Sequence, residues 1–291
     1  MNQQTSLGLA PCKINLFLKV FEKDLKGYHR LETAMVKLAF GDEIRIDVEL
    51  GQGIEVHVPG FEELDQQNNL CYQAAQLVLR HLGIERKVHI HIQKNIPVAA
   101  GLAGGSTDAA HILMTLNRML GQNIEENDLI KIAKTLGADV AFFLGKHNCA
   151  LLEGRGDVFK QSTDLPPLPV VLVNPLIAVS TGKVFEKLGR SLTWSRGSDS
   201  SSIQDLDVRS WSDLDHLLKK GNDLEEVAQS MHPKIGLIRE AFLDQGAMFS
   251  QMSGSGSTVF GLFDDVATAK HVAQQMSKFG RVICTQVLSP T

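Results

Sequence analysis

The chain has 291 residues, of which 43% are hydrophobic and 21% are charged, and its net charge is −4 at neutral pH. This length is comfortable for two compact domains, and the composition is ordinary for a globular protein. The negative net charge gives no electrostatic reason to expect nucleic acid or an anionic membrane as a partner. An anionic small molecule stays compatible with it, because a site can be locally positive.

The cysteines and the first residues indicate a compartment. Cys12, Cys71, Cys149 and Cys284 are widely scattered and form neither a CxxC pair nor a Cys/His cluster. A structural zinc site and a disulfide framework are therefore not expected. Residues 1–6 contain no basic segment that leads into an apolar run, and no apolar stretch approaches the roughly 20 residues that span a bilayer. We predict a soluble, cytoplasmic protein.

The first half of the chain opens with strands. Residues 14–21 are apolar enough for a buried strand, and residues 43–48 alternate in the manner of a half-buried one. Residues 54–58 and 88–92 repeat that alternation. Four strands are therefore expected before residue 93.

Helices are expected between and after these strands. Asn68 or Asn69 can cap a helix that runs through residues 73–79 to the glycine at 83. A second helix is predicted over 106–120, where apolar residues recur with a 3.6-residue period, and a third over 127–136.

A proline-rich segment, 166–169, marks a break near the middle of the chain. The polar run at 195–202 is predicted to be a loop. The other elements expected after the break are a strand at 170–173, a short helix around Val184, helices at 214–231 and 234–245, two strands within 248–263, a helix at 266–279 and a strand at 282–288. We predict an α+β protein in two lobes, residues 1–163 and 164–291.

A glycine-rich segment, Pro97–Thr107, lies between the strand that ends at 93 and the second helix. Its small residues let the backbone approach a ligand, and the N–H groups and dipole of the following helix favour an anion. Ser106 and Thr107 add hydroxyl groups for a phosphate or a magnesium ion. The segment is neither a Walker loop, because no lysine follows the last glycine, nor GxGxxG. From these residues alone, a phosphate loop and a plain connector capped by Ser106 or Thr107 are about equally favoured.

Three blocks in the chain resemble the motifs of the GHMP kinases, a family that includes galactokinase, homoserine kinase and mevalonate kinase. Residues 97–110, PVAAGLAGGSTDAA, resemble the central motif. Residues 10–16, APCKINL, are similar to the first motif, and residues 252–260, MSGSGSTVF, to the third. The resemblance implies an ATP-dependent small-molecule kinase. It also implies an N-terminal α/β lobe of the ribosomal protein S5 domain 2-like type and a ferredoxin-like C-terminal lobe, with ATP between them.

Three further segments narrow the resemblance within the family. Residues 13–18, 27–33 and 136–140 are similar to the branch that phosphorylates the 2-hydroxyl of 4-diphosphocytidyl-2-C-methyl-D-erythritol in non-mevalonate isoprenoid biosynthesis. This implies ATP as co-substrate, Mg²⁺, and a small-molecule substrate with a cytidine diphosphate group. A monomer or weak homodimer without nucleic-acid or membrane partners is expected. Ala141, where proline is usual, and Thr107, where a second serine is common, depart from the pattern without removing a catalytic group.

The resemblance also implies the catalytic and nucleotide-binding residues. Asp139 would orient the hydroxyl and accept its proton, and Lys13 would keep that carboxylate ionised and stabilise the transferred phosphoryl group. From position alone, Asp139 is better explained as a helix N-cap. For Lys13 the alternative is a solvated lysine at a strand edge, although a lysine inside this apolar strand would need a partner if it were buried. The predicted ATP-binding residues are Asn69, Lys94, Pro97, Val98, Ala99, Ala100, Gly101, Leu102, Ala103, Gly104, Gly105, Ser106 and Thr107.

The substrate residues follow from the same resemblance. Tyr28 would stack on cytosine and His29 would hydrogen-bond its polar edge, although without the family both are better explained as surface residues of a loop. The further predicted substrate residues are Asn15, Thr181 and Phe185. The residues that hold magnesium are left unknown, and the alternating His89 and His91 lack a third ligand, which makes them the polar face of a sheet.

Two other functions stay open. Another GHMP kinase would act on homoserine or mevalonate, but residues 27–29 argue against it because those relatives have no cytosine to stack. The second open function is that of a nucleotide-binding relative that no longer catalyses. The presence of both Lys13 and Asp139 argues against this function.

Overall fold

The computed structural model describes residues 4–25, 27–64, 67–121, 123–191, 208 and 211–290, so the predicted loop at 195–202 lies outside the described residues. The chain divides into two compact units that alternate along the sequence. The first unit contains Met1–Cys12, Phe40–Val98 and Ala103–Lys146, and the second contains Lys13–Ala39, Ala99–Leu102 and His147–Thr291. The alternation arises because two long strands, β1 (Gln4–Lys23) and β2 (His29–Glu49), contribute residues to both units. The predicted division at residue 164 stays a prediction.

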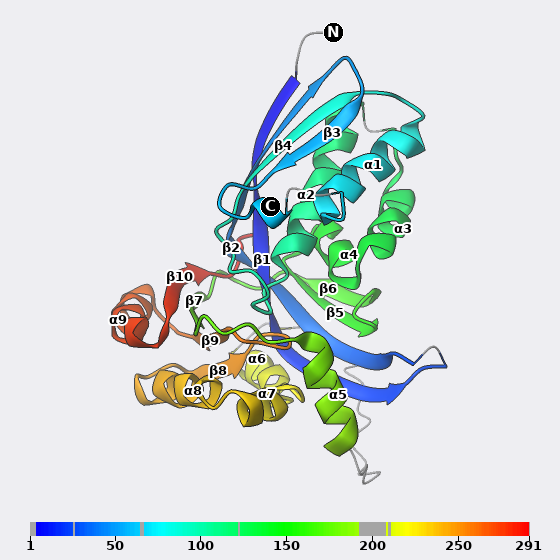
Figure 1. The fold of residues 1–291 in the computed structure, drawn as a ribbon. Coiled ribbons are helices and arrows are strands. Elements are labelled where there is room, and N and C mark those ends of the chain that lie inside the picture. The colour runs from blue at the N-terminus through cyan, green and yellow to red at the C-terminus, as the bar shows by residue number, and fades with distance from the viewer. Residues whose placement is uncertain are drawn as a thin grey trace. The chain divides into compact units, whose positions relative to one another are not determined.

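The first unit combines a small sheet with helices. The end of β2 pairs antiparallel with β4 (Lys87–Gln93), which pairs in parallel with β3 (Gly53–His57). Alternate residues of β4 are buried, as expected for a strand with one covered face. The four helices of this unit lie on one side of β3 and β4 (Figure 1). They are α1 (Leu70–Leu82), α2 (Gly104–Met119), α3 (Glu126–Leu136) and α4 (Ala138–Leu144), preceded by a short 3-10 helix at Glu62–Leu64.

The limits of α1 follow from its two caps. Asn69 Oδ1 accepts a hydrogen bond from the Cys71 N–H at 2.7 Å, which selects Asn69 over Asn68 as the N-cap. Gly83 ends the helix in the left-handed conformation, with a φ of 63°. The predicted helix is therefore confirmed, with Asn69 and Gly83 at its two ends.

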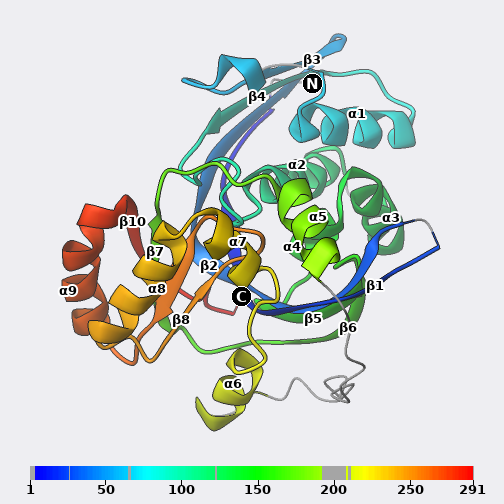
Figure 2. The same ribbon diagram turned by 60° about the horizontal axis from the view of Figure 1, so that its bottom comes forward.

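The second unit contains two groups of strands. The first part of β2 pairs antiparallel with β5 (Cys149–Gly154), which pairs with β6 (Val158–Thr163). A separate antiparallel sheet has the order β10-β7-β9-β8, formed by β7 (Pro169–Asn174), β8 (Phe249–Met252), β9 (Val259–Leu262) and β10 (Arg281–Gln286). The helices α8 (Lys234–Asp244) and α9 (Val266–Met276) lie beside this sheet (Figures 1 and 2). The sequence β7-α8-β8-β9-α9-β10 is the ferredoxin-like arrangement that was predicted.

The remaining helices of the second unit precede α8. They are α5 (Thr181–Ser191), α6 (Trp211–Leu218) and α7 (Glu225–Met231), and a 3-10 helix at Ser277–Phe279 follows α9. The single helix predicted over 214–231 is wrong, because Gly221 adopts a φ of 72° between α6 and α7. The elements that were not predicted are β5, β6, α4, the 3-10 helix at Glu62–Leu64 and the first parts of β1 and β2.

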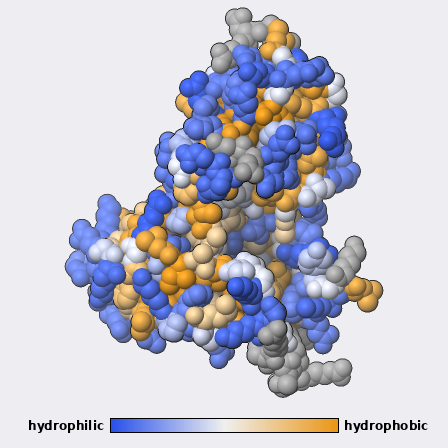
Figure 3. All heavy atoms as spheres, in the orientation of Figure 1, coloured by the Kyte–Doolittle hydropathy of each residue, from blue (hydrophilic) through white to orange (hydrophobic). Residues whose placement is uncertain are grey.

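The surface in the space-filling view is mostly hydrophilic, with scattered hydrophobic patches (Figure 3). Among the residues that the structure describes, no helix combines the length and the apolar character needed to cross a membrane.

Candidate active site

The glycine-rich segment leads directly into α2. Its N-cap is Ala103, in the left-handed conformation with a φ of 58°, and no described side chain caps the helix. The alternative interpretation, a plain connector with Ser106 or Thr107 as the helix N-cap, is therefore wrong, since both residues lie in the first turn of α2. Thr107 Oγ1 is buried and has no hydrogen-bond partner among the described residues. A helix start without a side-chain cap and with an unused hydroxyl group suits an anionic ligand.

The tip of this segment, residues 99–102, belongs to the second unit and contacts the glycine loop of the third motif. Ser253 Oγ donates a hydrogen bond to the Gly101 carbonyl oxygen at 2.9 Å, and the Thr258 N–H donates to the Ala100 carbonyl at 3.3 Å. A Cβ added at Gly101 would lie 2.2 Å from the Ser253 carbonyl oxygen, and the φ of Gly101 is 77°. Only glycine fits there, and the contact brings two of the three motifs together.

Lys13, from the first motif, lies at this same contact. Its side chain is buried, and its Nζ donates to Asn15 Oδ1 at 2.6 Å and to the Gly101 carbonyl oxygen at 3.0 Å. Asn15 in turn donates to Thr33 Oγ1 at 2.8 Å, and a Cβ added at Gly254 would lie 3.4 Å from Lys13 Nζ. The interpretation of Lys13 as a solvated lysine at a strand edge is therefore wrong, because residues of all three motifs surround its ammonium group.

Asp139 lies in the first unit, in the first turn of α4. The N-cap of α4 is Gly137, so the interpretation of Asp139 as an N-cap is wrong. A carboxylate in the first turn of a helix interacts favourably with the helix dipole.

Lys94 and Asn69 have contacts inside the first unit. The Lys94 ammonium contacts Asp42 Oδ2 and lies 2.8 Å from Asp108 Oδ2, and all three side chains are almost fully buried. Burial alone lowers the pKa of Lys94, but the charges of Asp108 and Asp42 outweigh it and raise that pKa. Asn69 caps α1 and donates its Nδ2–H to the Leu64 carbonyl at 2.8 Å.

His29 and Phe185, both predicted to bind substrate, lie together in the second unit. Their rings stack with centroids 5.6 Å apart. His29 Nδ1 is 2.8 Å from the Phe21 carbonyl oxygen, and since a carbonyl only accepts, Nδ1 carries the proton. In the neutral ring Nε2 is then a hydrogen-bond acceptor. It is buried without a partner among the described residues.

Tyr28 and Thr181 complete the predicted substrate residues. Tyr28 is 55% exposed, and the guanidinium carbon of Arg155 lies 3.7 Å from the centroid of its ring. Arg155 also lies 3.6 Å from Asp24, which accepts a hydrogen bond from the Tyr28 N–H. The Thr181 hydroxyl is 2.7 Å from Ser255 Oγ, so the start of α5 contacts the loop of the third motif.

Known proteins resemble this chain over almost its whole length. Residues 69–146 match the N-terminal domain of the GHMP kinases, and residues 202–282 match their C-terminal domain. The 4-diphosphocytidyl-2-C-methyl-D-erythritol kinase of Syntrophus aciditrophicus is 39% identical over 272 residues, covering 94% of this chain and 95% of the relative. That of Syntrophotalea carbinolica is 42% identical over 271 residues, covering 92% and 93%. The chain belongs to the GHMP kinase family.

A crystal structure of a 4-(cytidine 5′-diphospho)-2C-methyl-D-erythritol kinase matches this GHMP kinase with a TM-score of 0.78 at 32% identity, covering 97% of this chain and 99% of that one. The predicted family, two-part α+β fold and enzyme class are confirmed: the protein is an ATP-dependent small-molecule kinase. The roles assigned to individual residues stay predictions.

Three residues of this kinase that contact the predicted site were missed by the sequence reading. Asp42 and Asp108 hold Lys94, and Arg155 covers one face of Tyr28. Asp108 stands within the central motif, where an acidic residue in a run of small ones was a usable signal. Asp42 lies one residue before the strand predicted at 43–48, and Arg155 lies in a turn that was not predicted, so no local pattern pointed to either residue.

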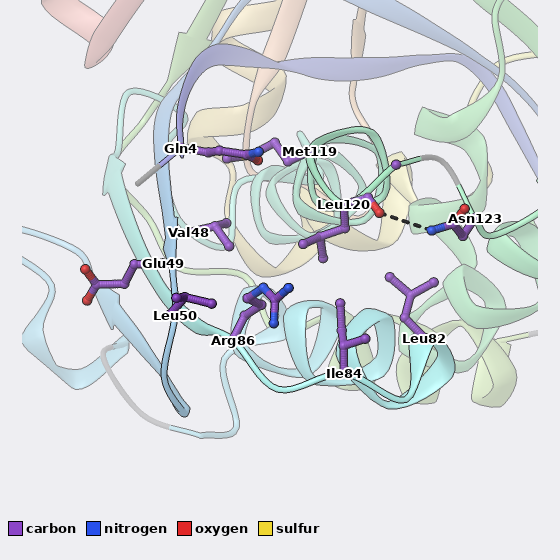
Figure 4. Close-up of a pocket in the computed structure, with 11 residues that line it drawn as sticks. Gln4, Val48, Glu49, Leu50, Leu82, Ile84, Arg86, Met119, Leu120 and Asn123 are labelled. Carbon is purple, nitrogen blue, oxygen red and sulfur yellow. Dashed lines mark hydrogen bonds between the residues drawn. The ribbon is translucent and has the colours of Figure 1, made fainter. Parts of the chain in front are cut away.

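A hollow of about 430 Å³ in the first unit of the kinase lies elsewhere (Figure 4). It is lined mainly by apolar side chains, among them Val48, Leu50, Ile84 and Met119, with Arg86 as a polar member. None of its lining residues is a predicted site residue, so it is not the candidate active site.

Proposed function

We propose that this kinase transfers the γ-phosphoryl group of ATP to the 2-hydroxyl of 4-diphosphocytidyl-2-C-methyl-D-erythritol. Relatives named for that alcohol match more than nine tenths of the chain, which supports the choice. Mevalonate and homoserine kinases also have similar folds, so the substrate must be argued from the site.

One observation in the site carries the choice of a cytidine substrate. The free acceptor at His29 Nε2 is buried beside the Phe185 ring. The 4-amino group of cytosine is a donor, and its flat ring can stack on aromatic side chains. A buried acceptor without a partner costs roughly 1–3 kcal/mol, which a bound cytosine amine would recover. Tyr28, exposed and held by Arg155, offers a further aromatic face.

The proposed phosphate site uses the backbone of Pro97–Thr107 and the N-terminus of α2. Phosphate oxygens would accept hydrogen bonds from first-turn N–H groups and from the unused Thr107 hydroxyl. Phosphoryl transfer asks mainly for positioning and charge stabilisation. We assign the stabilising charge to Lys13, whose ammonium lies beside the Gly101 carbonyl, and the orientation of the alcohol to Asp139.

Magnesium is expected to enter with the nucleotide. Such ions are usually held by substrate phosphates and waters with one or two protein groups. The described residues contain no cluster of three or more His, Cys, Asp or Glu side chains that would hold a metal alone. The Thr107 hydroxyl, buried without a partner in the described part of the chain, and its neighbour Ser106 fit as protein ligands. When bound, the ion neutralises charge on the β- and γ-phosphates.

The test is a phosphorylation assay with ATP and Mg²⁺ on 4-diphosphocytidyl-2-C-methyl-D-erythritol, mevalonate, homoserine and galactose. We expect turnover of the first alcohol alone, with CDP competing against that alcohol and not against ATP.

A substitution at His29 tests the proposed contact with cytosine. His29→Phe keeps an aromatic ring but removes the hydrogen-bond acceptor, so the KM for the cytidine substrate should rise roughly 5- to 150-fold while the KM for ATP stays unchanged. The exposed His81, changed to Phe, is the matched control. Equal turnover of mevalonate or homoserine would move the protein to another branch of the family.

A further inference from the structure

Three buried charged side chains join the two ends of the glycine-rich segment in the first unit. Before the segment, Asp42 Oδ1 accepts hydrogen bonds from the N–H groups of Asn95 at 2.6 Å and Ile96 at 2.7 Å. The other oxygen of Asp42 contacts Lys94 Nζ, which lies 2.8 Å from Asp108 Oδ2 in the second turn of α2. We call Asp42, Lys94 and Asp108 the ion cluster.

The ion cluster packs directly against the start of α2. A Cβ added at Gly104 would lie 3.1 Å from Ile96 Cγ2 and 3.2 Å from Lys94 Nζ. Asn95 Nδ2 also donates to the Gly41 carbonyl at 3.2 Å, which ties the same segment to β2. The positions of the residues before and after the loop are therefore fixed relative to each other by one set of contacts.

Stability alone is a poor explanation for this arrangement. Replacing a buried ion pair by well-packed apolar residues is often neutral or stabilising, because desolvation costs as much as the attraction returns. The ion cluster has two carboxylates for one ammonium, and Asp108 Oδ1 is buried without a hydrogen-bond partner among the described residues. What the cluster supplies is a defined geometry between a strand end and a helix N-terminus.

We propose that the Asp42–Lys94–Asp108 cluster is a positioning device that presets the backbone of the glycine-rich segment for the ATP phosphates. The proposal rests on the proposed phosphate-binding role of that segment. Lys94 then acts on ATP through the loop, since its ammonium is engaged by the two carboxylates. Backbone N–H groups that already have the geometry needed for the phosphates do not have to rearrange when ATP binds. A small displacement of the loop removes this advantage and should therefore weaken ATP binding.

The ionisation of Asp108 gives the proposal a pH signature. The groups that face it are Lys94 after β4, Asp42 on β2 and the buried Cys71 thiol on α1. Burial and the charge of Asp42 together raise the pKa of Asp108 to about 8, because the charge of Lys94 offsets only part of their effect. Above that pH the cluster has two negative charges for one ammonium, so one negative charge is left uncompensated near the N-terminus of α2, where the phosphates would bind. We expect ATP affinity to fall between about pH 7 and pH 9.

The test compares Lys94→Met and the near-isosteric Asp108→Asn with the parent, using calorimetry for ATP and steady-state kinetics for both substrates. Lys94→Met should raise the Kd and KM for ATP by at least about tenfold, the usual effect of losing a charged hydrogen bond, with the KM of the alcohol changed less than about twofold. Asp108→Asn should bind ATP like the parent at pH 7, because asparagine resembles the protonated carboxyl, and it should remove the fall in ATP affinity between pH 7 and pH 9. The control is Lys131→Met, which removes an exposed lysine paired with Asp128 on α3 of the same unit.

A third variant separates this proposal from the function on which it rests. The nearest atom to a Cβ added at Gly105 is Leu70 Cδ1, at 3.9 Å, so Gly105→Val adds bulk to the helix start without a clash inside the protein. If Gly105→Val loses ATP binding while a folded Lys94→Met variant binds ATP as the parent does, the positioning role is refuted and the phosphate loop stands. If Gly105→Val also binds ATP normally, the phosphate loop itself is refuted. If Lys94→Met does not fold, Asp108→Asn decides the question, because an unchanged fall in its ATP affinity between pH 7 and pH 9 would refute the positioning role.

Discussion

Asp139 and Lys13 are the residues on which the proposed chemistry depends. Lys13 is more than a charge: it fills a space between Asn15 Oδ1 and the Gly101 carbonyl oxygen, both of which would lose a donor if it were removed. Asp139 is half-buried in the first turn of a short helix, where replacement by asparagine preserves the shape of the side chain. The two positions therefore differ in how cleanly a substitution reports on catalysis.

Asp139→Asn should lower kcat by about 10²–10⁴-fold, the usual contribution of a positioned general base, while both substrates still bind. Lys13→Met should lower kcat comparably and also raise the KM for ATP, because the Gly101 carbonyl loses one of its two side-chain donors, Lys13, and keeps only Ser253. The double variant should be little worse than either single one, since groups that act as a unit are not additive. Rapid-quench measurements check this, with Asp128→Asn, a half-buried aspartate paired with Lys131 on α3, as the control. Near-parental turnover in Asp139→Asn would make Asp139 a structural residue.

At the scale of elements, the connection between α6 and α7 holds the third motif. Asn222 follows Gly221 in this connection and is almost fully buried. Its Nδ2 group donates to the carbonyl oxygens of Met252 at 2.9 Å and Gly254 at 2.8 Å, and its Oδ1 accepts from the Leu224 N–H at 3.0 Å. One side chain thus fixes both the break between two helices and the loop that contacts Gly101.

Asn222→Ala should lower the free energy of unfolding by roughly 2–4 kcal/mol, because it leaves two carbonyl groups and one N–H group buried without partners. Asn222→Asp keeps the shape and the acceptor but loses the donor, so it should also be destabilised. Urea unfolding measures both variants. We further expect reduced kcat in Asn222→Ala at temperatures where it is folded, since the loop beside Lys13 is released. Unchanged stability in both variants would contradict the role given to Asn222.

The same connection shows why some elements could not be predicted. Apolar residues continue at a helical spacing through residues 214–231, so one helix was the reasonable expectation, and hydrogen bonds to a distant loop decide otherwise. The strand β5 is a short apolar run without alternation, and α4 has only seven residues, both too short for a period to be recognised. Strands and helices with a clear period, such as β4, α2 and α9, were predicted close to their observed limits.

The residues of the candidate site likewise include some that the sequence predicts and others that it does not. Residues inside continuous motifs, such as Lys13 and Gly101, could be named from the sequence because neighbouring letters define them. The partners of these residues come from other strands and turns: Asp42 holds Lys94, and Arg155 covers Tyr28. No spacing along the chain encodes such contacts, since pairing of distant strands produces them.

For the molecule as a whole, stability should depend on pH through Lys37. This residue lies on β2 and is 6% exposed, its backbone bonded to Asn148 and Leu288. Burial lowers the pKa of Lys37 from 10.5 to about 8, and the charge of Asp164 offsets only part of that effect. Between those two values the unfolded chain binds more protons than the folded one, so the contribution of Lys37 to stability improves as pH rises. Below pH 8 the full cost of burying the charge is present.

Lys37→Met keeps the length of the side chain and removes this charge. A difference of about 2.5 pKa units, between 10.5 and about 8, corresponds to roughly 3 kcal/mol, so the variant should exceed the parent in unfolding free energy by up to that amount at pH 7. The difference should shrink steadily as the pH approaches 10.5, because the folded parent then carries a neutral amine. Urea unfolding of parent and variant at pH 7, 8, 9 and 10 measures it, with the exposed Lys146→Met as a control that should show little effect at any pH. A gap between Lys37→Met and the parent that does not change with pH would mean that the lysine stays charged throughout, held by stronger pairing than its burial implies.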